Sequence, residues 1–385
     1  MAALYLDYCA STPIDKRVLE AMNDVYVNHY GNAGSRTHVY GLNAKGIVEE
    51  SRRVLAEILK VDPSEVIFTS GASESDNIAT LGFRDYAESS GRKHIITTAI
   101  EHKAILEPLR YLESKGFQVD YVRPGSDGRI SAEDIVRRVR DDTLLVSVMH
   151  VNNETGVMQP VCEIGEALAS TNTWFHIDAA QSFGKLNDEL RGARYDLLSL
   201  SGHKIHGPQG IGALILKRSN YKRPPIHPIM FGGKQEYGFR PGTVPVARVA
   251  GLAKAAELMD KEYPTIRPQL EEIKSRIVSQ LSCCDYSING IPEYTLPNIL
   301  NLSIKGVDAE SVFTALKNDF AFSNGSACTS GTYAPSYVLQ AMDLNEERIG
   351  EALRISWWDE PVDLSALVAY AQSIAPLEVR KGRHR

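Results

Sequence analysis

Residues 200–212 read LSGHKIHGPQGIG, a short polar turn between two apolar segments. The apolar run 195–200 stops at Ser201, and a second apolar run covers 212–216. Glycine and proline keep the chain between them irregular, so the pattern predicts a strand, a tight turn and another strand. The turn carries Lys204 between histidines, where burial and nearby positive charge would favour the neutral, nucleophilic amine. An isolated turn lysine is more often a solvated side chain, so the rest of the chain decides.

The segments around this turn alternate between short apolar runs and helical patterns. The apolar runs predict strands at residues 4–7, 66–69, 94–98, 118–122, 144–149, 174–177 and 196–200. Strands that are apolar throughout are typical of a sheet covered on both faces. The alternation with helices therefore predicts an α/β fold with a mainly parallel sheet.

Polar residues repeatedly follow the carboxyl ends of these expected strands. They are Ser73, His102, Asn153, Asp178, Gln181, Ser201, His203 and Lys204. In open α/β sheets ligands bind at that edge, so we expect these side chains to share one site. The segment 70–77, SGASESDN, also reads as a helix start, whose N–H groups and dipole suit a phosphate. A plain capped helix without a ligand is the alternative for that segment.

The last third of the chain changes character. A helix is expected at 246–261, a break at Tyr263-Pro264, and a second helix at 265–281. Strands at 298–303, 320–323 and 353–357 then alternate with helices at 309–317 and 364–373. This pattern predicts a second, smaller α/β domain.

The composition excludes several classes of protein. The 385 residues are 43% hydrophobic and 23% charged, and the net charge of -6 argues against nucleic-acid binding. No run approaches ~20 apolar residues, and residues 1–7 lack the features of a signal peptide, so we expect a cytoplasmic protein without membrane contact. The five cysteines, Cys9, Cys162, Cys283, Cys284 and Cys328, form no C-x-x-C pair. A disulfide scaffold and a metal site are therefore not expected.

Four motifs together resemble the pyridoxal-phosphate (PLP) cysteine desulfurases of the NifS/IscS type, in the class V aminotransferase superfamily. They are residues 70–75 (SGASES), 178–181 (DAAQ), 201–204 (SGHK) and 325–330 (GSACTS), and the resemblance covers essentially the whole chain. It implies PLP fold-type I, in which a large domain holds a mainly parallel seven-stranded sheet beside a smaller α/β C-terminal domain. The large domain would span 14–260, and the small one 1–13 with 261–385. A homodimer is also implied.

The resemblance assigns cofactor roles to single residues. Lys204 would bind PLP covalently and move the substrate α-proton, and Asp178 would pair with the ring nitrogen. His102 would stack on the ring and relay a proton. Gln181 would bond the ring hydroxyl, and Asn153 would help to hold cofactor and substrate. The phosphate would be bound by Ala72, Ser73, Ser201 and His203, and by Thr243 of the other subunit.

For the substrate, the resemblance implies conversion of L-cysteine to L-alanine, with the sulfur kept as an enzyme persulfide for an acceptor protein. Asn32, Asn153 and Arg354 match positions that bind the substrate, and a guanidinium can hold a carboxylate with two hydrogen bonds. Cys328 decides the reaction, because a PLP lysine alone also fits transamination, decarboxylation or racemisation. Its segment 323–332, SNGSACTSGT, is typical of a mobile loop rather than of a core. The alternatives are a small buried hydrophobe at Cys328 and Cys9 as the acceptor thiol.

Two segments depart from the family's commoner pattern. Pro241 stands where serine is usual, and Trp357-Trp358-Asp359 follows the Arg354 strand. These departures leave the PLP residues intact and leave the sulfur pathway open between iron–sulfur assembly, tRNA thiolation and DNA phosphorothioation. Another class V PLP enzyme, such as a selenocysteine lyase or an aminotransferase, is one rival function. A non-catalytic scaffold is the other, although Lys204, Asp178 and His102 argue against it.

Overall fold

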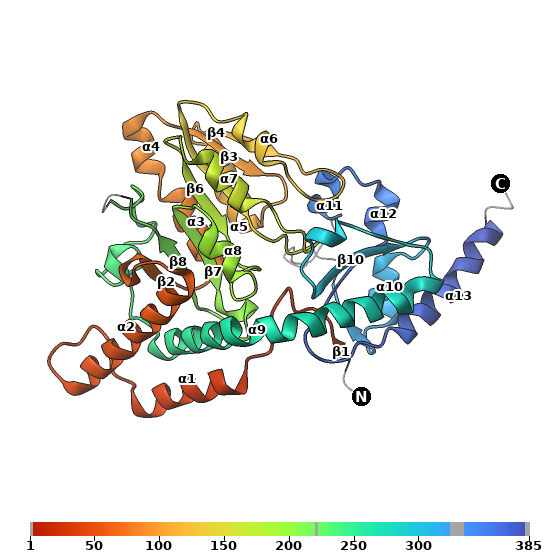
Figure 1. Ribbon diagram of the computed structural model, residues 1–385, viewed down its shortest axis with the longest axis horizontal. Helices are drawn as coiled ribbons and strands as arrows, with labels where there is room; N and C mark the ends of the chain where they lie inside the picture. The colour runs from red at the N-terminus through yellow and green to blue at the C-terminus, as the bar shows by residue number, and fades with distance from the viewer. Residues whose placement is uncertain (1–2, 220–221, 324–334, 382–385) are drawn as a thin grey trace.

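A seven-stranded sheet forms the centre of the computed structural model, which describes residues 3–219, 222–323 and 335–381 (Figure 1). In spatial order its strands are β2 (Val66–Thr69), β8 (Gly212–Leu216), β7 (Leu197–Ser201), β6 (Trp174–Asp178), β5 (Thr143–Met149), β3 (His94–Thr98) and β4 (Gln118–Val122). All neighbouring pairs from β7 to β4 are parallel, and β8 runs antiparallel to both β2 and β7. The expected mainly parallel sheet is confirmed.

Hydrophobic cores lie on both faces of this sheet. Neighbouring strand residues enter different cores: Ile67 and Ile95 pack on one face, Phe68 and Ile96 on the other. Full burial of such a side chain contributes about 1.5–3 kcal/mol. The first face is covered by α3 (Ala72–Leu81), α4 (Arg84–Ser90) and α5 (Lys103–Glu113). The second is covered by α1 (Lys16–Asn28), α2 (Val39–Leu59), α6 (Ala132–Val136), α7 (Val161–Leu168), α8 (Asn187–Gly192) and α9 (Val246–Gln280).

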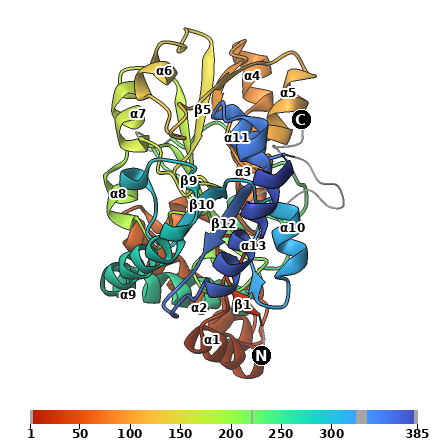
Figure 2. The same cartoon turned by 90° about the vertical axis from the view of Figure 1, so that its right-hand side faces the viewer.

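A smaller unit packs beside the large sheet, and Figure 2 turns it toward the viewer. Its antiparallel sheet has the order β12 (Ala352–Ser356), β10 (Ile299–Ile304) and β9 (Tyr286–Ile288). The N-terminal strand β1 (Leu4–Tyr5) pairs with β11 (Phe320–Ala321), and Asp7 bridges to Ser356. The helices are α10 (Ala309–Ala315), α11 (Tyr337–Ala341), α12 (Glu346–Gly350) and α13 (Ser365–Lys381). Short 3-10 helices are η1 (Pro63–Glu65), η2 (Gly202–Lys204), η3 (Glu236–Gly238), η4 (Leu281–Cys283) and η5 (Pro292–Tyr294).

The expected helix break at Tyr263-Pro264 is wrong. Helix α9 is continuous over 35 residues and contains both Pro264 and Pro268. A proline inside a helix removes a hydrogen bond and costs about 3 kcal/mol, which the burial of Tyr263 and Leu270 helps to offset. In Figure 1, α9 runs from α1 and α2 to the smaller unit, through the boundary expected at 260–261. The division into domains stays a prediction. Despite the length of α9, no helix within the described ranges is long and apolar enough to cross a membrane.

Candidate active site

A cavity of about 540 Å³ lies at the carboxyl ends of the parallel strands. Most of the residues that the sequence singled out line it: Ala72, Ser73, His102, Asn153, Asp178, Gln181, Ser201, His203, Lys204 and Arg354. Cys9, Ala10 and Ser11 add a wall from the N-terminal segment. The strand-end pattern therefore predicted where these side chains meet, and their roles in a reaction stay a prediction.

Three predicted residues are not part of this cavity. Asn32 and Thr243 are exposed on the single chain. Asn32 lies between α1 and α2, where its side-chain oxygen accepts a hydrogen bond from the Gly34 N–H at 2.8 Å. Cys328 lies outside the described residues. In the single chain, the described wall thus includes the predicted cofactor residues other than Thr243, together with the predicted substrate-binding Arg354.

The start of α3 forms one wall of the cavity. Gly71 precedes it with φ 153° and ψ 178°, a conformation that is essentially restricted to glycine. No side chain caps this helix end, so its first N–H groups and its dipole are available to an anion. The side chains of Ser201 and His203 line the same cavity. Glu74, in the first turn, is paired with Arg240 at 3.1 Å, which offsets its charge.

Lys204 ends the one-turn helix η2 and reaches the N-terminal segment. Its amine donates hydrogen bonds to the backbone oxygens of Cys9 and of Ala10, the latter at 2.9 Å. The Cys9 oxygen also accepts a hydrogen bond from Nε2 of Gln181 at 2.9 Å. One backbone oxygen thus links the predicted PLP lysine to the predicted partner of the ring hydroxyl.

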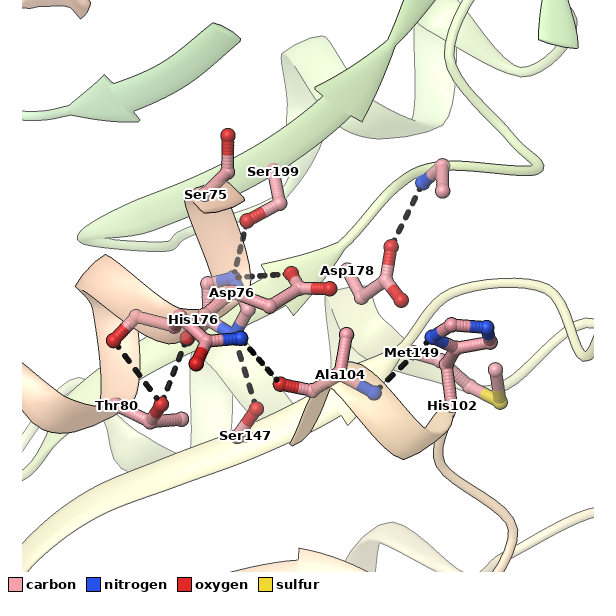
Figure 3. Close-up of polar contacts among 12 residues, drawn as sticks. Ser75, Asp76, Thr80, His102, Ala104, Ser147, Met149, His176, Asp178 and Ser199 are labelled. Carbon is pink, nitrogen blue, oxygen red and sulfur yellow. Dashed lines mark hydrogen bonds and ion pairs between the residues drawn. The ribbon is translucent and has the colours of Figure 1, made fainter. Parts of the chain in front are cut away.

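Hydrogen bonding and burial constrain two histidines of the cavity. His102 precedes α5, and its Nδ1 accepts a hydrogen bond from the Ala104 N–H at 3.1 Å (Figure 3). This bond fixes the ring and places the proton of its neutral form on Nε2. Burial and then the charge of Lys204 lower the pKa of His203 to about 4. Neutral His203 retains one N–H that can donate to an anion.

Arg354 approaches the cavity from β12 of the smaller sheet. The residue is 2% exposed, and its Nη1 donates to the Asn153 backbone oxygen at 2.9 Å. Its Nη2 pairs with Asp7 at 2.5 Å, so the N-terminal segment positions it as well. Nε has no hydrogen-bond partner in the described part of the chain. A guanidinium fixed in this way suits a carboxylate ligand.

Asp178 lies at the end of β6, where a carboxylate oxygen accepts the Ala180 N–H at 2.9 Å. Burial raises the pKa of this carboxyl group. Next to it lies a buried polar group that we did not predict, formed by Asp76 and His176 (Figure 3). The ring of His176 bonds the hydroxyls of Ser147 and Ser199, each at 2.9 Å.

A pattern for this polar group was present in the sequence. Ser147, His176 and Ser199 are single polar residues inside apolar strand runs. Ser147 and His176 are opposite one another in adjacent parallel strands. Polar side chains in fully buried strands require partners, so their coincidence in three central strands pointed to an internal network.

One residue of the unusual Trp357-Trp358 pair, Trp358, packs against the lysine turn. Trp357 is 1% exposed, and the Trp358 ring centroid lies 4.5 Å from that of His206. Trp358 also stacks against Tyr263 of α9. Trp358 thus supports the turn, and neither tryptophan lines the cavity.

The chain is similar to known proteins over nearly its whole length. The model of the aminotransferase class-V family matches residues 4–358. The chain belongs to this family. Cysteine desulfurase IscS of Pseudomonas putida (strain W619) is 42% identical over 370 residues, which are 94% of this chain and 91% of that protein. Within the class-V family, the chain therefore belongs with the cysteine desulfurases of the NifS/IscS type.

Solved structures agree with this placement. DndA from Streptomyces lividans is 46% identical with a TM-score of 0.81, over 92% of this chain and 99% of that one. A structure of SspA in complex with cysteine is 36% identical with a TM-score of 0.81, over 93% and 99% of the two chains. The resemblance and the PLP fold-type I architecture are both confirmed.

Proposed function

We propose that this class-V protein is a PLP-dependent cysteine desulfurase, which converts L-cysteine to L-alanine and takes the sulfur onto Cys328. The observation that carries the proposal is the set of groups around one cavity. The Lys204 amine, the Asp178 carboxyl group, the uncapped start of α3 and the Arg354 guanidinium all meet there. The cysteine desulfurase relatives support the same reaction.

The chemistry of the cavity fits the family's cofactor. An uncapped helix start with Ser201 and His203 suits the phosphate of PLP, and Asp178 suits a protonated ring nitrogen. Oε1 of Gln181 and Oδ1 of Asn153 are buried without hydrogen-bond partners in the described ranges. Unpaired buried oxygens are costly, so these two are consistent with contacts that a ligand completes. When bound, PLP supplies an electron sink that allows bonds at the substrate Cα and Cβ to break.

The side chains around the cavity would hold the cofactor, transfer protons and bind the substrate. Lys204 would hold the cofactor covalently and then carry the proton taken from Cα, since its amine lies on the cavity wall. His102, with its ring fixed by Ala104, would cover the cofactor ring and pass a proton through Nε2. Arg354 would hold the substrate carboxylate, with Asn153 beside it. Ala72 and Ser73 would donate their backbone N–H groups to the phosphate.

The thiolate of Cys328 would attack the substrate sulfur and hold it as a persulfide. Its small, polar, glycine-bearing segment supports this role, because a thiol that takes sulfur at one place and releases it at another must reach both. SspA has been seen in complex with cysteine, which supports L-cysteine as the substrate here. Cys9 packs in an apolar cluster with Val151 and Leu186, so it suits the role of a buried hydrophobe better.

Two residues point to a second subunit. Asn32 and Thr243 are exposed on the single chain, although family positions assign them to substrate and phosphate. We propose a homodimer in which each subunit supplies Thr243 to the other's phosphate site and Asn32 completes a substrate pocket. The large and small domains would divide as 14–260 and 1–13 with 261–385. We also propose that a separate acceptor protein receives the sulfur and that the enzyme acts in the cytoplasm.

The direct test is turnover of L-cysteine by the purified protein supplied with PLP. The proposal predicts equal amounts of alanine and sulfide when a thiol reductant is present. Pyruvate or a new amino acid instead of alanine would indicate another class-V reaction, and activity with selenocysteine alone would indicate a lyase. A protein that remains colourless with PLP would indicate a scaffold. Each of these three results would overturn the proposal.

A further inference from the structure

Three buried carboxyl groups lie near one another, two of them on the cavity wall and the third, Glu101, beside it. Asp76, Glu101 and Asp178 are exposed by 1%, 0% and 4%. A buried carboxylate requires cations or hydrogen-bond donors to remain ionised. The supply of such partners therefore decides which of the three carries a negative charge.

Asp178 has the partners that an anion requires. It accepts the Ala180 N–H at 2.9 Å, and His102 and Lys204 of the same cavity also favour its ionised form. Asp76 has fewer, because neither of its oxygens meets the geometry of a hydrogen bond in the described ranges, and the one hydroxyl that favours its ionised form, that of Ser199, is also bonded to His176. Figure 3 shows the Asp76 carboxyl group between the His176 ring and Asp178.

His176 does not supply a positive charge to Asp76. Its Nε2 lies 3.7 Å from the nearer Asp76 oxygen and bonds the Ser199 hydroxyl at 2.9 Å. Its Nδ1 bonds the Ser147 hydroxyl on the other side. The ring is fully buried between these neutral groups, and burial lowers its pKa to about 3. It is therefore neutral at physiological pH.

Glu101, the third carboxyl group, is also neutral near pH 7. It accepts hydrogen bonds from the Thr98 hydroxyl at 2.6 Å and from the Met149 N–H at 3.0 Å. Burial nevertheless raises its pKa to about 8. The described titratable groups facing Asp76 are thus His176 and Asp178 of β6 and Glu101 after β3, with hydroxyls from β5 and β7.

We propose that Asp76 is a positioning residue that stays a neutral carboxylic acid and leaves Asp178 as the single negative charge facing the ring nitrogen of PLP. Two carboxylates in one dry site cannot both ionise, so the proton stays on the one with the weaker partners. Asp76 also fills the space behind Asp178 and keeps water from it. The inference rests on the proposed function, because it takes Asp178 as the cofactor's partner.

The proton on Asp76 has a consequence for folding. Burial, and then the charge of Asp178, raise the pKa of Asp76 well above its usual value. The folded protein therefore keeps a proton that the unfolded chain releases above about pH 4. Stability is unaffected below that pH and falls as the pH rises toward the folded pKa. Asp76→Asn, a neutral group of the same shape, removes this loss.

The first experiment compares the apoproteins of the wild type and Asp76→Asn by denaturant unfolding between pH 4 and 8. The ratio of the folding equilibrium constant of the variant to that of the wild type should rise about tenfold for each pH unit above pH 4. The rise should stop at the pH where Asp76 loses its proton in the folded wild type. The infrared carbonyl band of a protonated carboxyl group should lose intensity in the variant. Asp85→Asn, at an exposed site, should change neither measurement. A pH-independent difference, or an unchanged carbonyl band, would contradict a neutral Asp76.

The second experiment measures the affinity of each apoprotein for PLP by its visible absorbance. Asp76→Asn should bind within about threefold of the wild type, whereas Asp76→Ala should lose more than tenfold by admitting water next to Asp178. A tenfold loss in Asp76→Asn would show that a charge on Asp76 is required and would overturn the inference. Asp178→Asn separates the two claims. If it binds PLP as the wild type does, the proposed function fails, and the apoprotein data still decide the state of Asp76.

Discussion

Lys204 is positioned by residues of the N-terminal segment, 194 and 195 positions earlier in the chain. Its amine bonds the backbone oxygens of Cys9 and Ala10, and Asp178 lines the same cavity. These contacts separate it from an ordinary turn lysine. The two backbone oxygens hold the amine on the cavity wall, where a nucleophile can reach a bound ligand.

Replacing Lys204 with alanine should abolish PLP chemistry. The purified variant should lack the visible absorbance of a covalently held cofactor and should form no alanine from L-cysteine. Lys274→Ala is a matched control, because that lysine is also largely buried but lies on α9, near Leu296. The control should keep both properties. Alanine formation by Lys204→Ala at the wild-type rate would remove this lysine from the mechanism.

Arg354→Lys should weaken binding of L-cysteine more than it slows turnover. Lysine cannot form the two parallel hydrogen bonds of a guanidinium, and hydrogen bonds to charged groups contribute about 1.5–3 kcal/mol each. We therefore expect KM to rise about 10- to 100-fold with a smaller change in kcat. Arg348→Lys, on α12 of the same smaller unit and hydrogen-bonded to Asn289, is the control. An unchanged KM would exclude Arg354 from the carboxylate site.

At this scale, the sequence predicted the residues that lie at strand ends. Ser201, Asp178 and Asn153 follow parallel strands, whose carboxyl ends must meet at one edge. The resemblance brought Cys9 to the site as a rival thiol, but the hydrogen bonds from Lys204 to the Cys9 and Ala10 backbone oxygens were not predicted, because they join residues about 194 positions apart. Nor did it reveal Asp76, which looks like an ordinary acidic residue at a helix start.

Among the elements, the lysine turn is the most constrained. His206 follows it at φ 59°, a left-handed conformation, and its ring lies against Trp358. Nδ1 of His206 bonds the Pro13 backbone oxygen at 3.0 Å. The turn is therefore held by the N-terminal segment in front and by Trp358 behind.

His206→Asn should make the apoprotein less sensitive to acid. Burial lowers the pKa of His206 to about 4, so the unfolded chain binds its proton first as the pH falls. The stability that this ring contributes is complete above about pH 6.5 and is lost toward pH 4. Asparagine tolerates the positive φ, so the variant keeps the backbone of the turn. Because it has no titrating ring, the slope of unfolding free energy against pH should fall by about 1.4 kcal/mol per pH unit between pH 4 and 6.5. Exposed His227→Asn is the control. An unchanged slope would contradict a neutral buried His206.

Helix α9 shows where local sequence rules failed. An interruption was predicted at Pro264, because a proline removes a helical hydrogen bond. Contacts with α1 and α2, which are far away in the sequence, keep the helix continuous. Tertiary packing thus overrode a strong local preference, whereas the strands, which are apolar throughout, were predicted from local pattern alone.

At the scale of the whole molecule, large apolar side chains are exposed near the predicted partner-facing residues. Tyr26 and Val27 of α1 are exposed by 56% and 70%, and Tyr30 by 68%, close to Asn32 in the chain. Phe231, in the segment that leads to Thr243, is exposed by 86%. Such a set is typical of a surface that another chain covers.

The double variant Tyr26→Asp with Val27→Asp should therefore separate the proposed dimer. Light scattering should give the mass of one chain instead of two, and PLP affinity should fall because Thr243 no longer reaches the other subunit's phosphate. Tyr111→Asp, at an exposed site on α5, should leave the mass unchanged. A wild-type protein that is monomeric and still binds PLP would refute the shared site.

The central claim is that sulfur from L-cysteine moves to Cys328. The measurement is mass spectrometry of peptides from the PLP-loaded enzyme after one turnover with L-cysteine, together with the alanine released. We predict one added sulfur atom on the Cys328 peptide for each alanine, and none on the peptides of Cys9, Cys162, Cys283 or Cys284. Cys328→Ser should keep its visible absorbance and its spectral response to L-cysteine, but release no sulfur. Sulfur release by Cys328→Ser at the wild-type rate, or the added sulfur on another cysteine, would contradict the account.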